Sequence, residues 1–317
     1  MSTAHFSSAA DTAEQVPQLE TLAPGCYGFI SRHDPNCGFI VGEEAVLVVD
    51  TRATPRLGRE LHDAIRTVTD RPVRYVFLTH FHAVRALGAS VFTDATVIST
   101  LGTREWIRTR GEADFISERD RFPRLFRGVE EIPGLTHPHV AFDGSLLLDL
   151  GGIQVEFLGF GRAHTQGDAA AWVPSRKVLY AGDLVENSCG VYAGDAYITD
   201  WIETLGRLRA VPAEVMVPGR GTFVRGRTAV EEAMDGTAAF LSTLRQSVAA
   251  ASGSGADLRG CFAAAEAAMR PRFGDWPLFG HVLPFDVARM HEELSGTEHP
   301  TIWTAERNRN LWRTLRS

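Results

Sequence analysis

The chain has 317 residues, of which 44% are hydrophobic and 22% charged, and it contains 30 Gly and 15 Pro. These values lie near the average of globular proteins, so they exclude collagen-like, low-complexity and disordered classes. The net charge of −7 argues against a nucleic-acid partner, because phosphate contacts need clustered Lys and Arg. No apolar run approaches the roughly 18 residues of a membrane-spanning helix. We therefore expect a small-molecule substrate, with neither nucleic acid nor a membrane as partner.

The cysteines and the first residues indicate the cellular compartment in which we expect the protein. The chain has four cysteines, which are Cys26, Cys37, Cys189 and Cys261. None lies in a C-x-x-C pair, which argues against a thiolate zinc site, and scattered cysteines are typical of reduced cytosolic thiols. The first residues lack the basic and apolar regions of a signal peptide, so we expect a cytoplasmic protein. Residues 1–19 are mostly small and polar, which predicts a flexible N-terminal arm.

The next part of the chain is rich in predicted strands. Short β-rich runs bounded by turn residues predict strands over residues 26–30, 38–42, 45–50, 73–80 and 95–100. Before the fourth of these runs, residues 56–68 place apolar side chains at helical spacing, which predicts an amphipathic helix. A strand, a helix and a strand in this order form a βαβ unit, so a parallel sheet is expected.

Residues 102–135 are charged and aromatic, and they predict a partly helical excursion. Two interpretations stay open for it: helices that cover the core, or a lid or wall over a site. Further along, the pattern predicts a hairpin and three more strands, over residues 145–160, 169–174, 177–183 and 214–219.

From Thr228 onward the pattern becomes helical. We predict that residues 228–317 form a C-terminal helical extension packed on the core. The Ala- and Leu-containing helix over 229–250 is of a kind that packs against a partner, so we also expect a homodimer.

Histidine and aspartate residues stand where several predicted strands end. His80 ends the strand over 73–80 and His82 follows it, whereas His164 and Asp183 stand at two later strand ends. Ligands of open α/β sheets bind at the carboxyl ends of the strands. Three imidazoles and one carboxylate are a suitable ligand set for a divalent metal. The sequence therefore predicts a metal site built from these four residues.

These motifs resemble those of the metallo-β-lactamase superfamily. The resemblance is carried by THFH (79–82), AHTQGD (163–168), AGD (181–183), VPGRG (217–221), VVDT (48–51) and PNCGFIVG (35–42). It implies an α/β fold, a four-layer αββα sandwich in which two mixed sheets lie face to face and the metal site lies at one edge. We accordingly predict a metallo-β-lactamase-like domain over residues 20–227, between the arm and the helical extension.

Three positions depart from the family's pattern. The first motif of the family usually reads His-x-His-x-Asp-His, but here Val84 stands at the Asp position and Arg85 at the third His position. Arg220 stands where the family usually has His after Pro-Gly. By resemblance, these positions hold most of the second metal of dinuclear members. Valine offers no ligand atom and a guanidinium repels a cation, so one metal is expected rather than two.

Two hypotheses describe these arginines, and they are compatible. Arg85 and Arg220 can pair with Asp183 and keep a buried site neutral. Alternatively, they can bind a substrate carboxylate or stabilise an oxyanion. Asp183, Arg85 and Arg220 are therefore the candidate catalytic residues.

The resemblance implies a metal-dependent hydrolase of an ester, thioester, lactone or related acyl substrate. The three imidazoles would hold one divalent metal, with zinc as the first choice and iron or manganese as alternatives. An open position would remain for water, whose pKa a metal lowers toward about 7. Asp183 would orient this water or act as general base. An irregular aromatic stretch near the C-terminus favours an aromatic substrate, and the two arginines favour an anionic one.

Three other functions stay open. Two His with one carboxylate form the ligand set of non-haem iron oxygenases, which His80, His164 and Asp183 would supply. A lyase or isomerase would use the same site as a Lewis acid. The fold can also serve as a non-catalytic metal-binding or sensing module.

Other polar residues receive a structural interpretation first. Asp50 resembles the family's buried structural Asp, so we expect it to orient a ligand, and we expect Asp168 to serve its own loop backbone. His137 and His139 have the spacing of a metal pair, but a surface loop is the preferred interpretation. The segment 272–285 is too irregular for a core helix, and it is interpreted as a packed return loop or as a pocket wall with His281 facing the substrate.

Overall fold

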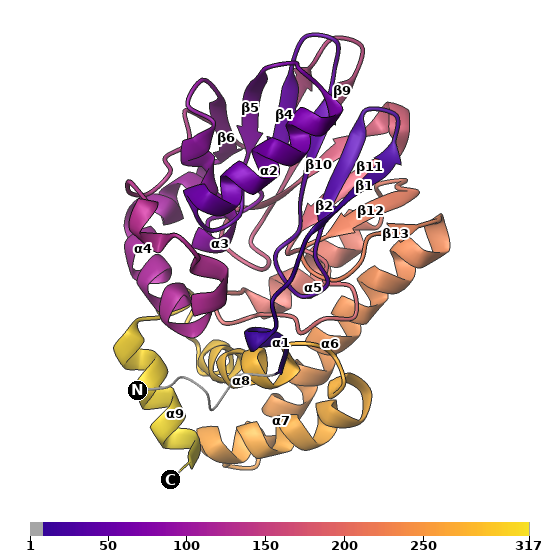
Figure 1. The fold of residues 1–317 in the computed structure, drawn as a ribbon. Helices are drawn as coiled ribbons and strands as arrows, with labels where there is room; N and C mark the ends of the chain where they lie inside the picture. The colour runs from indigo at the N-terminus through magenta and orange to yellow at the C-terminus, as the bar shows by residue number, and fades with distance from the viewer. Residues whose placement is uncertain (1–8, 317) are drawn as a thin grey trace.

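The computed structural model describes residues 9–316, in which two sheets lie face to face with helices outside them (Figure 1). The first sheet follows chain order and contains β1 (Gln18–Ala23), β2 (Cys26–Ile30), β3 (Cys37–Val41), β4 (Val46–Val49), β5 (Val73–Phe77), β6 (Thr96–Thr100) and β7 (Val140–Phe142). Neighbours are antiparallel from β1 to β4 and parallel from β4 to β7. The predicted βαβ unit is confirmed, because α2 (Pro55–Val68) connects β4 to β5.

The second sheet is mainly antiparallel. Its spatial order is β13 (Val224–Arg225), β12 (Val215–Pro218), β11 (Val178–Gly182), β10 (Asp168–Val173), β9 (Gln154–Gly161) and β8 (Ser145–Asp149). Only β11 and β12 form a parallel pair among these strands. The predicted hairpin over 145–160 corresponds to β8 and β9. Two mixed sheets therefore form the predicted αββα sandwich.

Apolar side chains fill the space between the sheets. Phe77 of β5 stacks on Phe157 of β9 with ring centroids 4.3 Å apart, and both side chains are fully buried. On the outer face of the first sheet, α2 contributes Leu61 and Ile65 to a separate cluster. The loops of the two sheets also meet, since the backbone N–H of Ala169 donates to the carbonyl of Thr79 at 2.9 Å.

The excursion after β6 is mostly one long helix, as expected for a partly helical segment. It consists of α4 (Leu101–Arg121) followed by the short 3-10 helices η2 (Pro123–Phe126) and η3 (Val129–Glu131). Thr100 caps α4, because its side chain accepts a hydrogen bond from the backbone of Thr103. Between β5 and β6 lie α3 (Ala83–Ala86) and η1 (Leu87–Val91), directly after the first pair of histidines.

The C-terminal third is helical, as predicted, and it lies below the sandwich in Figure 1. Its helices are α6 (Arg227–Gly253), α7 (Leu258–Phe273), α8 (Phe279–Leu294) and α9 (Ala305–Arg316). A further helix, α5 (Ile198–Leu208), precedes β12. Side chains of α5, α6, α7 and α8 share one hydrophobic cluster with the second sheet.

The prediction of an irregular segment over residues 272–285 is wrong for the second half of this segment. The helix α8 begins at Phe279 and continues through Pro284. A proline inside a helix removes one backbone hydrogen bond. Here the apolar side chains around it, including those of Val282, Leu283 and Phe285, are buried, and their packing offsets that loss.

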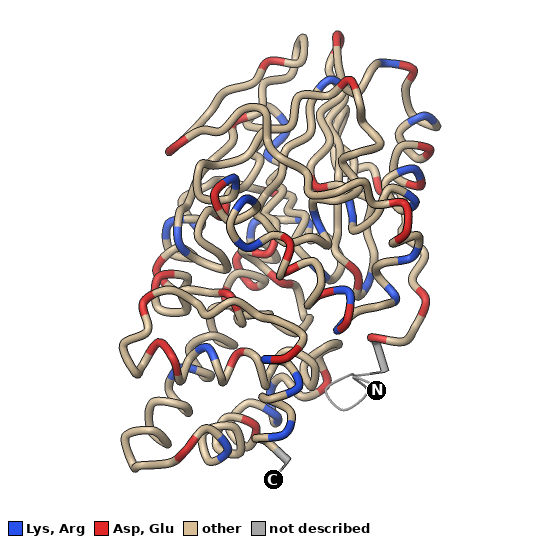
Figure 2. The backbone as a smooth tube through the Cα atoms, turned by 90° about the vertical axis from the view of Figure 1, so that its left-hand side faces the viewer, with Lys and Arg blue, Asp and Glu red and all other residues tan. Residues whose placement is uncertain are grey.

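Residues 1–8 of the predicted N-terminal arm lie outside the described residues. The later part of the arm contains α1 (Ala9–Thr12) and the start of β1. Acidic and basic positions are intermixed over the face shown in Figure 2. Within the described part of the chain, no helix combines the length and apolar character that crossing a membrane requires.

Candidate metal centre

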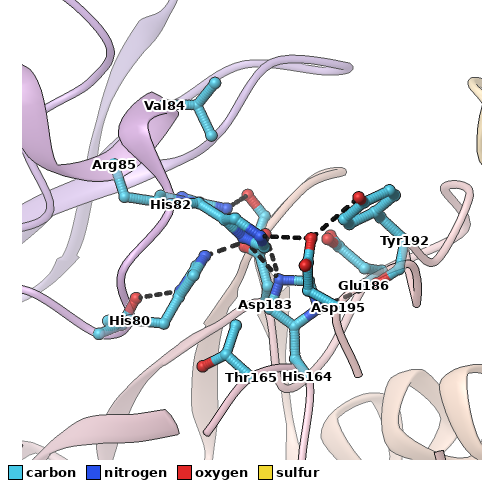
Figure 3. Close-up of polar contacts among 12 residues, drawn as sticks. His80, His82, Val84, Arg85, His164, Thr165, Asp183, Glu186, Tyr192 and Asp195 are labelled. Carbon is cyan, nitrogen blue, oxygen red and sulfur yellow. Dashed lines mark hydrogen bonds and ion pairs between the residues drawn. The ribbon is translucent and has the colours of Figure 1, made fainter. Parts of the chain in front are cut away.

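The structure brings the four predicted ligands together. His80 and His82 follow β5, His164 follows β9, and Asp183 comes directly after β11. All four side chains are buried, and one ligand atom from each lies within 4.8 Å of the others. Figure 3 shows the three imidazoles turned toward one another around the carboxylate. All four ligand residues thus stand in loops at strand ends, as the sequence pattern predicts.

The spacing of these atoms suits one metal ion. His164 Nε2 lies 3.1 Å from His82 Nδ1 and 3.5 Å from Asp183 Oδ2, and His80 Nε2 lies 3.6 Å from Asp183 Oδ2. Ligands of a tetrahedral zinc ion at about 2.0–2.1 Å are separated by about 3.3 Å. His80 Nε2 is buried and has no hydrogen-bond partner within residues 9–316. The residues present therefore fit a divalent metal.

Hydrogen bonds fix the orientation of two of the rings. The Thr79 hydroxyl donates to Asp50 Oδ2 at 2.9 Å, so it accepts from His80 Nδ1 at 3.0 Å. His164 Nδ1 donates to the carbonyl of Tyr192 at 2.9 Å. Both assignments leave the Nε2 lone pair facing the centre. Asp50 therefore acts on His80 through Thr79, whose backbone N–H it also accepts at 2.9 Å.

His82 is turned the other way. Its Nδ1 faces the centre, whereas its Nε2 lies 3.4 Å from Asp195 Oδ2 and 4.0 Å from Asp114 Oδ1. Arg110 Nη2 donates to Asp195 Oδ1 at 2.9 Å, and the Tyr192 hydroxyl donates to Asp195 Oδ2 at 3.0 Å. Burial by itself lowers the pKa of His82, but the neighbouring carboxylates outweigh it and raise this pKa to about 9.

Asp114 and Asp195 were not among the predicted site residues. Asp195 had a recognisable signal, because it ends a second Ala-Gly-Asp sequence, residues 193–195, that repeats the one ending at Asp183. Asp114 lies in the middle of α4, where a polar residue carries no local sign of a role. Carboxylates that hold the far nitrogen of a metal-binding imidazole commonly orient the ring and raise its basicity.

Arg85 binds Asp183 and two backbone carbonyls around it. Its Nη2 donates to Asp183 Oδ1 and, at 2.8 Å, to the carbonyl of Gly219, while its Nη1 donates to the carbonyl of Asn36. The side chain is fully buried. Burial raises the pKa of Asp183, but Arg85 and the other nearby cations outweigh it and hold this pKa well below its usual range. Asp183 is therefore ionised, and Arg85 neutralises its charge.

Arg220 approaches the other oxygen of the same carboxylate. Its Nη1 donates to Asp183 Oδ2 at 3.2 Å and to Glu186 Oε1 at 3.1 Å. Both arginines thus pair with Asp183, as the first hypothesis expects. Val84 contributes no ligand, because its side chain has no ligand atom, and its backbone N–H donates to Glu118 Oε2.

A cavity opens beside the four ligands. Its lining comes from the end of α4, the strand-end loops and α8, and consists of His82, Glu118, Arg121, Phe122, Asp183, Gly190, Tyr192, Arg220, Leu278 and Val282. Arg220 reaches this cavity, whereas Arg85 does not. The excursion over 102–135 therefore supplies a wall of the site, which favours the second of its two interpretations.

The other polar residues singled out in the sequence have structural partners outside the four-residue cluster. Asp168 accepts the backbone N–H of Thr165 at 2.6 Å and its hydroxyl at 2.9 Å, as expected for a loop residue. His137 and His139 are exposed, and His139 Nδ1 accepts the backbone N–H of Val97. The surface-loop interpretation of this pair is therefore confirmed.

His281 does not face the cavity. It is buried in α8, its ring lies 4.0 Å from that of Phe122, and its Nδ1 lies 3.3 Å from Asp11 Oδ2. Its environment is that of a packed core residue, and it is not among the residues that line the cavity.

Comparison with known proteins agrees with this geometry. Residues 31–220 match the Metallo-beta-lactamase superfamily. A linear primary-alkylsulfatase of Pseudomonas sp. (strain ATCC 19151) is 22% identical over 232 residues, which cover 62% of this chain and 43% of that protein. Metallo-beta-lactamase IND-1 of Chryseobacterium indologenes is 26% identical over 202 residues, covering 61% of this chain and 74% of that protein.

Solved structures share the fold. The stereoselective inverting sec-alkylsulfatase Pisa1 from Pseudomonas sp. superimposes with a TM-score of 0.69 at 15% identity, covering 87% of this chain and 50% of that one. The DIM-1 metallo-beta-lactamase superimposes with a TM-score of 0.55 at 19% identity, covering 73% of this chain and 99% of that one. The chain spans about half the length of the alkylsulfatases it matches. With its family match over residues 31–220 and its His-His-His-Asp cluster, the chain belongs to the metallo-beta-lactamase superfamily.

Proposed function

We propose that the protein is a metal-dependent hydrolase that uses a single divalent metal ion, with zinc as the first choice. One observation carries the proposal: three imidazole nitrogens and a carboxylate oxygen converge in a buried centre, and the ring orientations are set by outside partners. When bound by His80, His82 and His164, such a metal supplies a Lewis acid and lowers the pKa of a water molecule toward about 7.

The protein's own residues would perform the remaining work. Asp183 is ionised, and its Oδ2 faces two of the imidazoles, so it can complete the ligand set or take a proton from the attacking water. Arg220 lines the cavity and can stabilise negative charge that develops on the substrate. The guanidinium of Arg85 binds Oδ1 of Asp183, whereas His80 and His164 approach Oδ2, and this fixed positive charge supports one metal rather than two.

The substrate class follows by likeness rather than by geometry. An ester, thioester, lactone or related acyl compound is our first candidate. A sulfate ester is the second, and a structural likeness favours it: the alkylsulfatase fold covers 87% of this chain, including helices beyond the sandwich, whereas DIM-1 covers 73%.

Elemental analysis of the freshly purified full chain tests the proposal. We expect one metal ion per chain, lost on dialysis against a chelator together with hydrolytic activity. His164→Ala should lower the metal content at least tenfold, because it removes a ligand from a buried set. His137→Ala is the matched control, since its imidazole is exposed and does not belong to the ligand cluster.

Activity is measured on panels of acyl esters, thioesters, lactones and alkyl sulfates, with an oxygen electrode in parallel. Equal trace metal in the wild type and in His164→Ala would refute the metal site. Oxygen consumption with bound iron would replace the hydrolase by an oxygenase. Full metal content without turnover on any panel would favour a non-catalytic module.

A further inference from the structure

Arg121, the last residue of α4, is buried and unsatisfied. The residue is 5% exposed. Its Nε, Nη1 and Nη2 are all buried, and none has a hydrogen-bond partner among the described residues. A guanidinium carries five N–H donors. Leaving a buried charged donor without an acceptor is costly, so such groups are normally paired.

The position of the Arg121 side chain indicates where a hydrogen-bond acceptor from a ligand would lie. Arg121 lines the cavity that also contains His82, Asp183 and Arg220. The side chain of Arg121 therefore borders the same cavity as the candidate metal ligands His82 and Asp183. Glu118, one turn earlier on α4, also lines the cavity, but its Oε2 already accepts the backbone N–H of Val84 at 3.0 Å.

Aromatic rings hold the guanidinium in place without satisfying its N–H groups. The Cζ atom of Arg121 lies 4.9 Å from the ring centroid of Tyr192, 4.8 Å from that of Phe285 and 5.9 Å from that of Phe122. Cation–π contacts of this kind favour the charge and orient the side chain. The donor fork is thus positioned in advance while its hydrogen-bonding capacity stays unused.

We infer that Arg121 binds the anionic group of the substrate, an oxyanion such as a carboxylate or a sulfate carried on an apolar chain. A planar guanidinium matches such oxyanions with two parallel hydrogen bonds. Phe122, Leu278 and Val282 also line this cavity and give it apolar surface. The inference deepens the proposed function and rests on it, because it places a charged substrate beside the candidate metal centre.

Binding of simple anions to the full chain tests this role. The probes are sodium octyl sulfate, sodium octanoate and, as the uncharged counterpart, 1-octanol, titrated calorimetrically into metal-loaded and chelator-treated protein. We expect wild type to bind one or both anions more tightly than octanol. Arg121→Met should weaken anion binding roughly 10- to 100-fold, the range for lost hydrogen bonds to charged groups, and leave octanol binding unchanged. Preference between the two anions distinguishes sulfate from carboxylate.

Arg119→Met is the matched control. Arg119 lies on the same helix, also stands over an aromatic ring, and is 41% exposed while paired with Asp120. The control removes the same charge, and it should keep wild-type affinity for all three probes. If Arg121→Met does not fold, Arg121→Lys carries the test, because an ammonium keeps the charge but lacks the fork, and anion affinity should still fall severalfold.

The possible outcomes separate the two proposals. Anion affinity that is unchanged in the Arg121 variants, or lost equally for octanol, would overturn the role of Arg121 and leave the hydrolase proposal standing. Arg121-dependent anion binding in a freshly purified protein that neither contains metal nor takes it up would support the anion site and refute the hydrolase.

Discussion

At the scale of single residues, the two nitrogens of His82 have different surroundings. Nδ1 faces the other imidazoles, and Nε2 faces Asp195 and Asp114. The carboxylates raise the pKa of His82 to about 9 against the lowering effect of burial. Without metal, His82 is therefore protonated at neutral pH. The charged ring stabilises the metal-free fold below about pH 6.5, and this contribution is lost as pH rises through about 9.

Metal binding should consequently depend on pH. A metal must displace the proton of His82, so binding at pH 7 should release about one proton, and the apparent affinity should rise about tenfold per pH unit up to about pH 9. Asp195→Asn removes one of the charges that raise the pKa of His82. In this variant the metal affinity should therefore stop rising at a lower pH. Zinc titrations by calorimetry, in buffers that differ in protonation enthalpy, count the protons. Release of no proton at pH 7 would contradict this interpretation of His82.

The residues that the sequence predicted and those that it missed differ in how the chain positions them. His80, His164 and Asp183 follow strands that local apolar runs make recognisable, so their place at a common edge was predictable. Arg121 and Asp114 lie on α4, and their distance from the centre depends on how that helix packs over the loops. A single sequence contains no local signal for this packing.

At the scale of elements, helix α6 is bonded to the loop that follows β11. The hydroxyl of Thr237 accepts the backbone N–H of Glu186 at 3.0 Å and donates to its carbonyl at 3.1 Å. The Glu186 side chain in turn accepts from Arg220. The C-terminal helices thus hold one wall of the site. Helix α5 was not predicted, and its N-cap residue, Tyr197, makes no side-chain capping bond that a sequence pattern could show.

Thr237→Val tests this connection, because it keeps the shape of the side chain but leaves the Glu186 backbone unpaired. The free energy of unfolding should fall by about 1–3 kcal/mol, measured by denaturant titration. Thr243→Val is the control, since the Thr243 hydroxyl donates only within α6, to Ala239 at 2.7 Å, and a change within about 0.5 kcal/mol is expected. An equal decrease in the free energy of unfolding in both variants would show that the hydrogen bonds to Glu186 do not stabilise the fold more than a bond within α6 does.

At the scale of the whole molecule, the sandwich and the C-terminal helices share their core. One hydrophobic cluster contains Leu179 of the second sheet, Trp201 of α5, Phe240 of α6 and Phe285 of α8. The αββα part was predictable because its strands alternate with turn residues and its motifs resemble a known family. How the helices pack on it was not, since the Ala-rich pattern of α6 and α7 fits several packing faces.

A chain ending at Gly226 should therefore lose cooperative unfolding. Removal of the helices exposes the apolar side chains of the second sheet and α5, and dye binding with near-native circular dichroism in the far ultraviolet is the expected signature. Thermal unfolding followed by near-ultraviolet circular dichroism is the measurement. A single sharp transition together with one bound metal per chain would show that the sandwich folds on its own.

The ion pair between Arg85 and Asp183 also affects how the centre responds to metal supply. A diffusible ion obeys mass action and leaves when its free concentration falls. The guanidinium of Arg85 is covalently tethered and held in place by three acceptors. Part of the positive charge at this carboxylate thus persists under metal starvation. With the single metal ion that we propose, loading would be a one-ion equilibrium, in which no second ion has to bind or be retained.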